Sequence, residues 1–275
     1  GDLTLDVAGD IILDADGGDF KFQDGGTEIL RITISSIDVV IRPVVDAKDI
    51  IIKLIDEKLC SAIEIGIPFS DPIAEGKTIQ RSSSIALKNG VTIDSTLKTI
   101  SEINDYNKDT PIISMGYYNP ILKIGIDNFF SGCKESGVNG VIIADIPNTE
   151  LEIIQETSNK YNIETIPLVP LNASDRTVEH ACKIGQGFIY CVSVLGVTGT
   201  REQLSKDLNK KVNQVSKFSD VPVAVGFGIS KNSHIKELKN YADAAVIGSA
   251  IIDVISYSEN NEIDNVVKFI KGLLK

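Results

Sequence analysis

The sequence lacks the features that mark membrane-spanning, secreted and nucleic-acid-binding chains. Among its 275 residues, no apolar stretch approaches the roughly 20 residues of a membrane span. The start shows no basic segment followed by an apolar one, so we expect no secretory signal. Basic residues are outnumbered, because 27 Lys and Arg face 38 Asp and Glu, and the net charge is −11. An acidic chain without a basic cluster argues against binding to nucleic acid or to an anionic membrane.

Cysteine and histidine are scarce as well. The four cysteines, Cys60, Cys133, Cys182 and Cys191, form no C-x-x-C pair, and most have apolar neighbours. We interpret them as reduced, buried thiols of a cytoplasmic protein without a metal site. The two histidines lie in helix-like segments far from the glycine-rich stretches, which argues against a catalytic role. No G-x-G-x-x-G motif follows the first expected strand, which argues against a dinucleotide-binding fold.

Residues 1–36 differ in composition from everything that follows. They hold eight acidic and two basic residues, so this segment carries more than half of the net negative charge. Apolar residues alternate, and Gly-Gly turns at residues 16–18 and 24–26 separate the runs, which predicts short β-strands and hairpins. Residues 14–19 resemble a calcium loop, but Gly25 occupies the position of the Glu that an EF-hand needs. We interpret the segment as an additional β-hairpin-like domain without chemistry.

From residue 37 onward, apolar strands alternate with amphipathic helices. The expected strands cover residues 37–41, 62–67, 111–115, 141–144, 165–169, 187–192, 221–225 and 244–247. The expected helices cover residues 46–59, 78–88, 95–104, 127–136, 150–161, 174–184, 203–218, 233–240 and 263–274, with a short one from Ser249. Strict alternation predicts a parallel sheet, and eight strand–helix units in about 240 residues favour a closed α/β barrel, the (β/α)8 TIM barrel. We therefore assign residues 37–275 to one catalytic barrel domain.

One carboxylate, Glu64, interrupts the apolar strand expected at residues 62–67. A charge in a barrel strand is costly unless it is paired or its pKa changes. Two interpretations stay open from this stretch alone. Glu64 either points outward to solvent, or it is an acid–base group near the strand end, where barrel enzymes have their active sites. In the second case its pKa is raised, which suits proton transfer near neutral pH.

Glycines follow the last three expected strands. They form the segments Gly196-Val197-Thr198-Gly199, Gly226-Phe227-Gly228 and Gly248-Ser249. The loops after strands seven and eight, together with a short helix N-terminus, form the common phosphate site of such barrels. Glycine lets backbone N–H groups approach an anion, and the helix dipole adds positive potential. These segments predict a phosphorylated ligand.

Several motifs follow one another with the spacing of one known family. They run from residues 64–72 (EIGIPFSDP), 115–120 (MGYYNP) and 144–147 (ADIP) to Tyr190 and the three glycine segments. Together they resemble the tryptophan synthase alpha subunit family over roughly residues 44–275. The resemblance implies a lyase of tryptophan biosynthesis. Such an enzyme cleaves indole-3-glycerol phosphate to indole and glyceraldehyde 3-phosphate in a retro-aldol reaction.

The resemblance also implies a role for each matching residue. Glu64 is then the general acid–base group, and Glu75 is the carboxylate that holds the indole N–H. The implied substrate-binding residues are Tyr117, Tyr190, Thr198, Gly199, Phe227, Gly228, Gly248 and Ser249. Pro68 and Asp71 are implied to face the beta subunit in an α2β2 heterotetramer. The family needs no metal or organic cofactor for this reaction, and pyridoxal phosphate is expected only in the beta partner.

Three features depart from the family pattern. Glu75 stands where the family usually has Asp, and residues 39–43 (VVIRP) replace a Thr/Gly-rich strand end. Residues 1–36 stand where the family has an N-terminal helix. We expect Arg42 near the barrel mouth, where it could pair with Glu64 or Glu75. These departures leave an alternative, a catalytically weak alpha-like barrel that binds and activates a beta subunit. A third class is a different phosphate-binding barrel enzyme, or a chimera in which the N-terminal segment disturbs the fold.

Overall fold

The chain divides into two compact units in this computed structural model, Gly1–Asp46 and Ala47–Lys275. The structure describes residues 20–24, 27–35, 38–42, 47–192, 207–226, 228–258 and 261–275, and before Ala47 it describes the backbone only. The sequence predicts the division after residue 36, ten residues earlier than the structure has it. The difference arises from the pairing of one strand, at residues 38–42.

Three strands form the antiparallel sheet of the first unit, β1 (Phe20–Asp24), β2 (Thr27–Ser35) and β3 (Asp38–Arg42). β1 pairs with β2 in a register that sets Phe20 opposite Ile32. β3 lies within one residue of the first expected barrel strand, but it pairs with β2, with Val40 opposite Thr33. A strand rich in β-branched residues fits either kind of ladder, so its partner cannot be predicted from its composition.

The described part of the second unit holds eight strands in two four-stranded parallel sheets, ordered β4-β5-β6-β7 and β11-β10-β9-β8. The strands are β4 (Ile63–Gly66), β5 (Ile112–Gly116), β6 (Gly140–Ile143), β7 (Glu164–Thr165), β8 (Leu168–Pro170), β9 (Ile189–Val192), β10 (Val223–Gly226) and β11 (Ala244–Ala245). Every strand expected from residue 62 onward is found. The strand expected at residues 165–169 is split into β7 and β8, because Pro167 has no N–H to donate to a ladder.

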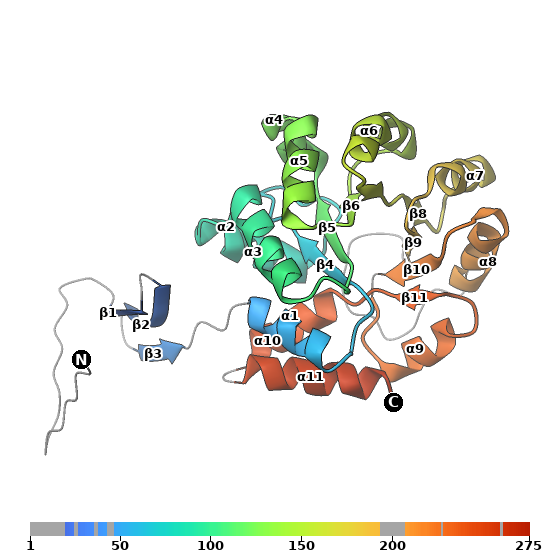
Figure 1. Ribbon diagram of the computed structural model, residues 1–275. Coiled ribbons are helices and arrows are strands. Elements are labelled where there is room, and N and C mark those ends of the chain that lie inside the picture. The colour runs from blue at the N-terminus through green and yellow to red at the C-terminus, as the bar shows by residue number, and fades with distance from the viewer. Residues whose placement is uncertain are drawn as a thin grey trace, which may run out of the picture. The chain divides into compact units, whose positions relative to one another are not determined.

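Helices follow the strands and lie around them in the second unit (Figure 1). They are α1 (Ala47–Asp56), α2 (Lys77–Lys88), α3 (Ile93–Tyr106), α4 (Tyr118–Ile124), α5 (Ile126–Ser136), α6 (Asn148–Lys160), α7 (Asp175–Ile184), α8 (Leu208–Phe218), α9 (Asn232–Leu238), α10 (Ser249–Tyr257) and α11 (Glu262–Leu273). Each expected helix is found with ends shifted by a few residues, and α4 is additional. The expected alternation of strands and helices is therefore confirmed for this unit.

Local sequence signals decide where the helices begin and end. At the start of α3, Thr92 Oγ1 accepts a hydrogen bond from the Ser95 N–H at 3.1 Å, and the Thr92 N–H donates to Ser95 Oγ at 2.9 Å. This reciprocal pair is a capping box, which satisfies two helix-start donors. α5 ends at Gly137, whose φ of +83° is natural for glycine in a left-handed helix cap. Such signals make the helix positions predictable from the sequence.

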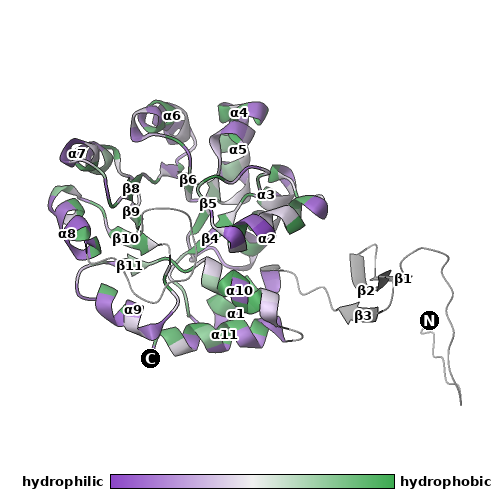
Figure 2. Cartoon of the chain, turned by 180° about the vertical axis from the view of Figure 1, so that it is seen from behind, coloured by the Kyte–Doolittle hydropathy of each residue, from purple (hydrophilic) through white to green (hydrophobic). Residues whose placement is uncertain are grey.

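The alternation of residues along β5 separates two apolar layers. Ile112 faces the helices and belongs to a large cluster with Phe129 and Phe130 of α5. Ile113 and Met115 face the other way, into a smaller inner cluster with Ile142, Ile166 and Tyr190. The inner cluster draws residues from both sheets, as expected where the sheets enclose a common interior. In Figure 2 the strands of the second unit are mostly coloured hydrophobic, whereas the helices carry both colours.

The described residues contain neither a candidate membrane span nor a candidate metal site. No described helix is both long enough and apolar enough to cross a membrane. In the same part of the chain, no three His, Cys, Asp or Glu residues are grouped so that they could hold a metal ion. The four cysteines are free thiols, and Cys133, Cys182 and Cys191 are buried.

Candidate active site

Glu64 lies in the middle of β4, opposite Ile113 of β5. Directly paired residues of neighbouring strands point to the same face of a sheet, and Ile113 belongs to the inner cluster. The Glu64 side chain therefore points to the interior that the two sheets enclose. This placement contradicts the interpretation in which Glu64 points outward from the barrel. By solvent accessibility the residue is exposed, so water and a substrate can reach it.

Burial, and to a smaller extent the nearby charge of Glu75, together raise the pKa of the Glu64 carboxyl to about 7. The exposure of Glu64 and the burial that raises its pKa are compatible, because surrounding protein atoms can limit the hydration of a carboxyl group that still touches water. Both causes disfavour the ionised form of the acid. The expected rise of this pKa is confirmed. A carboxyl that titrates near neutral pH can both donate and accept a proton during one reaction cycle.

Glu75 is held in the loop between β4 and α2, where it is only 6% exposed. Its N–H donates to the Pro72 carbonyl at 3.0 Å, and its own carbonyl accepts a hydrogen bond from Gln80 Nε2 at 2.8 Å. One residue earlier, the Ala74 N–H donates to the Tyr117 hydroxyl at 3.1 Å. The backbone on both sides of the Glu75 side chain is therefore fixed. The role of Gln80 has no signal in the sequence, because it depends on how the loop folds back on α2.

Two buried tyrosines, Tyr117 and Tyr190, surround the acids. Burial is the largest cause that raises the pKa of each phenol above its usual value. The charge of Glu75 raises both pKa values further, and Glu64 also acts on Tyr190. Glu75 therefore lies near both phenols and near Glu64, and Glu64 lies near Tyr190. The phenols stay protonated at neutral pH, so they can donate hydrogen bonds beside the two carboxyl groups.

The position of Tyr190 depends on a glycine in the next strand. β9 pairs with β10 so that Tyr190 lies opposite Ala224. A Cβ atom added at Gly226, two residues further along β10, would overlap the phenol ring of Tyr190. The sequence places Gly226 only in a possible phosphate loop. Its packing role was missed because a cross-strand contact leaves no local pattern.

The ends of the last two strands carry the residues expected at a phosphate. Helix α10 begins at the buried Ser249, directly after Gly248. Among the described residues, a Cβ atom at Gly248 would meet no atom within 4 Å. Gly228 has a φ of +82°, which an L-residue rarely adopts. Thr198, Gly199, Phe227 and the side chain of Arg42 lie outside the described residues.

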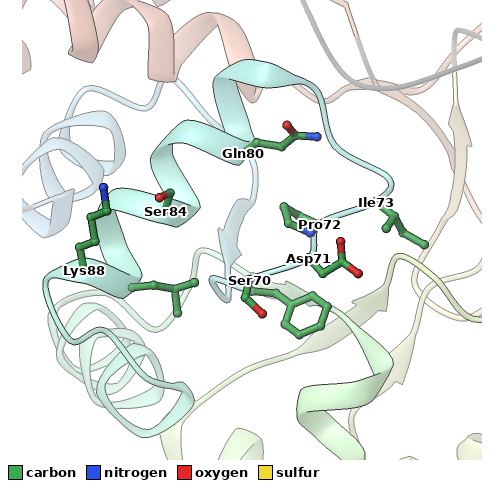
Figure 3. Close-up of a pocket in the computed structure, with 9 residues that line it drawn as sticks. Ser70, Asp71, Pro72, Ile73, Gln80, Ser84 and Lys88 are labelled. Atoms are coloured by element: carbon green, nitrogen blue, oxygen red, sulfur yellow. The ribbon is translucent and has the colours of Figure 1, made fainter.

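A surface hollow of about 590 Å³ lies between the loop after β4 and one face of α2 (Figure 3). The loop contributes Ser70, Asp71, Pro72 and Ile73, and α2 contributes Gln80, Ser84, Leu87 and Lys88. Ile73 is 65% exposed, which is unusual for a large apolar side chain. Phe69 also lines the hollow, and its ring lies 5.3 Å from the Tyr117 ring between centroids. The hollow is therefore adjacent to the group of acids and tyrosines.

Comparisons with known proteins agree on one family. A family model described as "Tryptophan synthase alpha chain" matches residues 39–273. The tryptophan synthase alpha chain of Thermoanaerobacter sp. (strain X514) is 39% identical over 227 residues, which cover 82% of this chain and 86% of the relative. That of Clostridium kluyveri is 38% identical over 262 residues, which cover 94% of this chain and 97% of the relative.

Solved structures agree with the sequence comparisons. One similar chain comes from work on the tryptophan synthase α2β2 complex of the hyperthermophile Pyrococcus furiosus. It matches with a TM-score of 0.76 and 35% identity, over 82% of this chain and 92% of that one. The α/β fold of the second unit is thus that of the alpha subunit, a TIM barrel. The chain belongs to the tryptophan synthase alpha chain family.

Proposed function

We propose that this chain cleaves indole-3-glycerol phosphate to indole and glyceraldehyde 3-phosphate, with Glu64 as its acid–base group. Membership of the tryptophan synthase alpha chain family supports the activity, a lyase reaction of tryptophan biosynthesis. One observation carries the assignment to Glu64. Its carboxyl points to the barrel interior, has a pKa of about 7 and lies near a second carboxylate, Glu75.

The proposed reaction is a retro-aldol cleavage. The protonated Glu64 carboxyl donates a proton to the indole ring carbon that bears the glycerol chain. Glu75 holds the indole N–H and stabilises the positive charge that this protonation creates. The Glu64 carboxylate then takes the proton of the glycerol hydroxyl next to the ring. The carbon–carbon bond breaks, its electron pair returns to the ring, and the hydroxyl carbon leaves as the aldehyde.

Two further groups of residues are proposed to hold the two ends of the substrate. Tyr117 and Tyr190 line the indole end, which is supported by their burial beside the acids. The phosphate lies at the N-terminus of α10, where the Ser249 hydroxyl and the backbone N–H groups favour an anion. The glycine-rich loops complete this end with Gly228 and Gly248, and, from the family pattern, with Thr198, Gly199 and Phe227.

The reaction needs no cofactor in this chain, because in this family pyridoxal phosphate belongs to the beta subunit. We propose an α2β2 assembly with such a beta subunit, like the complex described for Pyrococcus furiosus. The loop that contains Pro68 and Asp71 is the proposed contact with this partner. The exposed Ile73 and the neighbouring surface hollow support this choice, because apolar surface is common where proteins bind one another.

The two parts of the chain have different proposed roles. The catalytic barrel domain lies within residues 37–275, of which Ala47–Lys275 form one compact unit, and residues 1–36 form an additional acidic, hairpin-like β segment without a part in the chemistry. The start of the matched family region at residue 39 supports this boundary. The buried free thiols of Cys133, Cys182 and Cys191 support a cytoplasmic location, where such thiols stay reduced.

The release of indole from indole-3-glycerol phosphate by the purified chain tests the proposal. We expect equal amounts of indole and glyceraldehyde 3-phosphate without added metal or pyridoxal phosphate. The longer side chain of Glu75, where the family usually has Asp, favours a second candidate, the catalytically weak barrel that activates a beta subunit. That candidate predicts no indole from the chain alone but faster turnover of an added beta subunit. If neither effect is seen, both proposals are wrong.

A further inference from the structure

Helix α2 contributes nothing to the hydrophobic core. None of its 12 residues, all of which the structure describes, is buried, and Ile85 is 53% exposed. Most helices are held by an apolar stripe packed against the core. α2 must therefore be held by other contacts. Its position matters because α2 begins two residues after Glu75, so a shift of the helix moves this carboxylate.

A cluster of polar side chains joins α2 to α10. Thr78, in the first turn of α2, donates a hydrogen bond from Oγ1 to Asp253 Oδ1 at 3.0 Å. Arg81 Nη2 lies 3.9 Å from the same oxygen, and the Asp253 side chain is 25% exposed. The Arg81 guanidinium also lies 5.9 Å from the ring centroid of Tyr257, the last residue of α10. Asp253 is thus the acceptor on which both α2 side chains converge.

Asp253 connects the two ends of the proposed substrate site. It lies four residues after Ser249, so both side chains are on the same face of α10, one turn apart. On the other side of the contact, Gln80 Nε2 ties α2 to the carbonyl of Glu75 at 2.8 Å. A continuous path therefore leads from the N-terminus of α10 through Asp253 and Thr78 to Glu75.

We propose that Asp253 is a positioning residue, which sets the distance between Glu75 and the N-terminus of α10 by holding α2 through Thr78. This inference rests on the proposed function, since a substrate with an indole at one end and a phosphate at the other needs both sites at a constant separation. The hydrogen bond from Thr78 to Asp253, and not the ion pair with Arg81, is the contact that holds α2. The ion pair is long and the Arg81 side chain is 47% exposed, so solvent screens it.

The test uses three variants that separate the hydrogen bond from the charge. Asp253→Ala removes both the acceptor and the negative charge. Asp253→Asn removes the charge but keeps an oxygen that accepts from Thr78. Thr78→Val removes the donor and keeps the charge. Ser256→Ala, at an exposed position of the same helix, is the control, and thermal unfolding curves check that each variant is folded.

Two ligands are titrated by calorimetry. Indole-3-propyl phosphate spans both ends of the site and has no hydroxyls to react, whereas inorganic phosphate needs only the α10 end. Asp253→Ala and Thr78→Val are expected to bind the spanning ligand about tenfold more weakly, well below the roughly 100-fold rate loss for a 1 Å misplacement. Asp253→Asn and Ser256→Ala are expected to bind it like the parent. Inorganic phosphate is expected to bind equally to Asp253→Ala and Asp253→Asn. The kcat for indole release is expected to fall in the same variants that bind indole-3-propyl phosphate more weakly.

Three results would overturn the inference. Thr78→Val could bind the spanning ligand like the parent, Asp253→Asn could bind it as weakly as Asp253→Ala, or inorganic phosphate could bind more weakly to Asp253→Ala than to Asp253→Asn. Failure of the proposed function looks different, because the parent would then release no indole although the binding pattern holds. A parent chain that binds neither ligand overturns both.

Discussion

The two ends of the barrel strands differ in what surrounds side-chain oxygens such as those of Asn139, Asp243 and Glu64. At the N-terminal ends, side-chain oxygens accept hydrogen bonds from the first N–H of a strand. Asn139 Oδ1 accepts from the Ile112 N–H at 2.9 Å, and Asp243 Oδ2 accepts from the Val223 N–H at 2.8 Å. These oxygens satisfy donors that would otherwise be unpaired at the strand starts, so this end contributes to stability.

At the C-terminal ends, carboxyl groups lie near one another and near buried phenols. Glu64 has a raised pKa because of burial and because Glu75 is close. Like charges in a site of limited hydration cost stability, and such sites persist where the chemistry requires them. A carboxylate at a strand end can therefore serve stability or chemistry, and the residue type alone does not indicate which. The role follows from whether a backbone donor or another acid is its neighbour.

The largest effect is expected for Glu64→Gln. The amide keeps the shape of the side chain but cannot take or give the proton, so kcat for indole release is expected to fall on the order of 100- to 10,000-fold. Unfolding curves of the variant should still show a cooperative transition. A variant with a near-parent rate would contradict the acid–base role and remove the contrast between the two strand ends.

A smaller effect is expected for Gly226→Ala. The added methyl group overlaps the Tyr190 ring, which must then move within the site. We expect kcat/KM for indole release to fall by up to about 100-fold, the loss for a misplacement of roughly 1 Å. Gly272→Ala is a matched control, since a Cβ atom at Gly272 in α11 would meet nothing within 4 Å. Equal activity of the two variants would show that the position of Tyr190 is unimportant.

At the opposite strand ends, Asp243→Ala is expected to change stability and leave catalysis unchanged. The Val223 N–H loses a charged acceptor, which lowers the free energy of unfolding by about 1.5–3 kcal/mol. Urea denaturation measures this loss, and kcat at 25 °C serves as the second readout. If kcat falls together with the free energy of unfolding, the claim that the N-terminal strand ends serve stability and not catalysis is wrong.

The smallest effect is expected in the pH dependence of stability, because solvent screens the exposed Glu64 carboxyl. Because the pKa of Glu64 is raised from 4.5 to about 7 in the fold, the folded chain holds this proton more tightly than the unfolded chain. The contribution of Glu64 to the free energy of unfolding therefore falls as pH rises from 4.5 towards 7 and is constant above. Glu64→Gln should gain stability relative to the parent between pH 5 and pH 8. When Glu75→Gln is already present, adding Glu64→Gln should give a smaller rise in stability between pH 5 and pH 8. If Glu64→Gln differs from the parent by the same free energy of unfolding at pH 5 and at pH 8, the raised pKa is contradicted.

The sequence predicts the fold of the second unit in detail, because periodicity and caps are local signals. The strands around Glu64 and Tyr190 and the start of α10 are found within a few residues of their expected positions. The partner of residues 38–42 was not predictable, because one extended segment can join different sheets. The break at Pro167 was also missed, although a residue without an N–H is a signal for it.

For the site, the sequence by itself determined the residue types and their order along the chain. Motifs from residue 64 to residue 249 identify the family, and with it the acids, tyrosines and glycines that we propose for its reaction. Only the tertiary structure decided that Glu64 faces inward near Glu75, that Gly226 makes room for Tyr190, and that Asp253 holds α2. The physical reason is distance along the chain. Pairs such as Thr78 and Asp253, which are 175 residues apart, meet only when the barrel has formed.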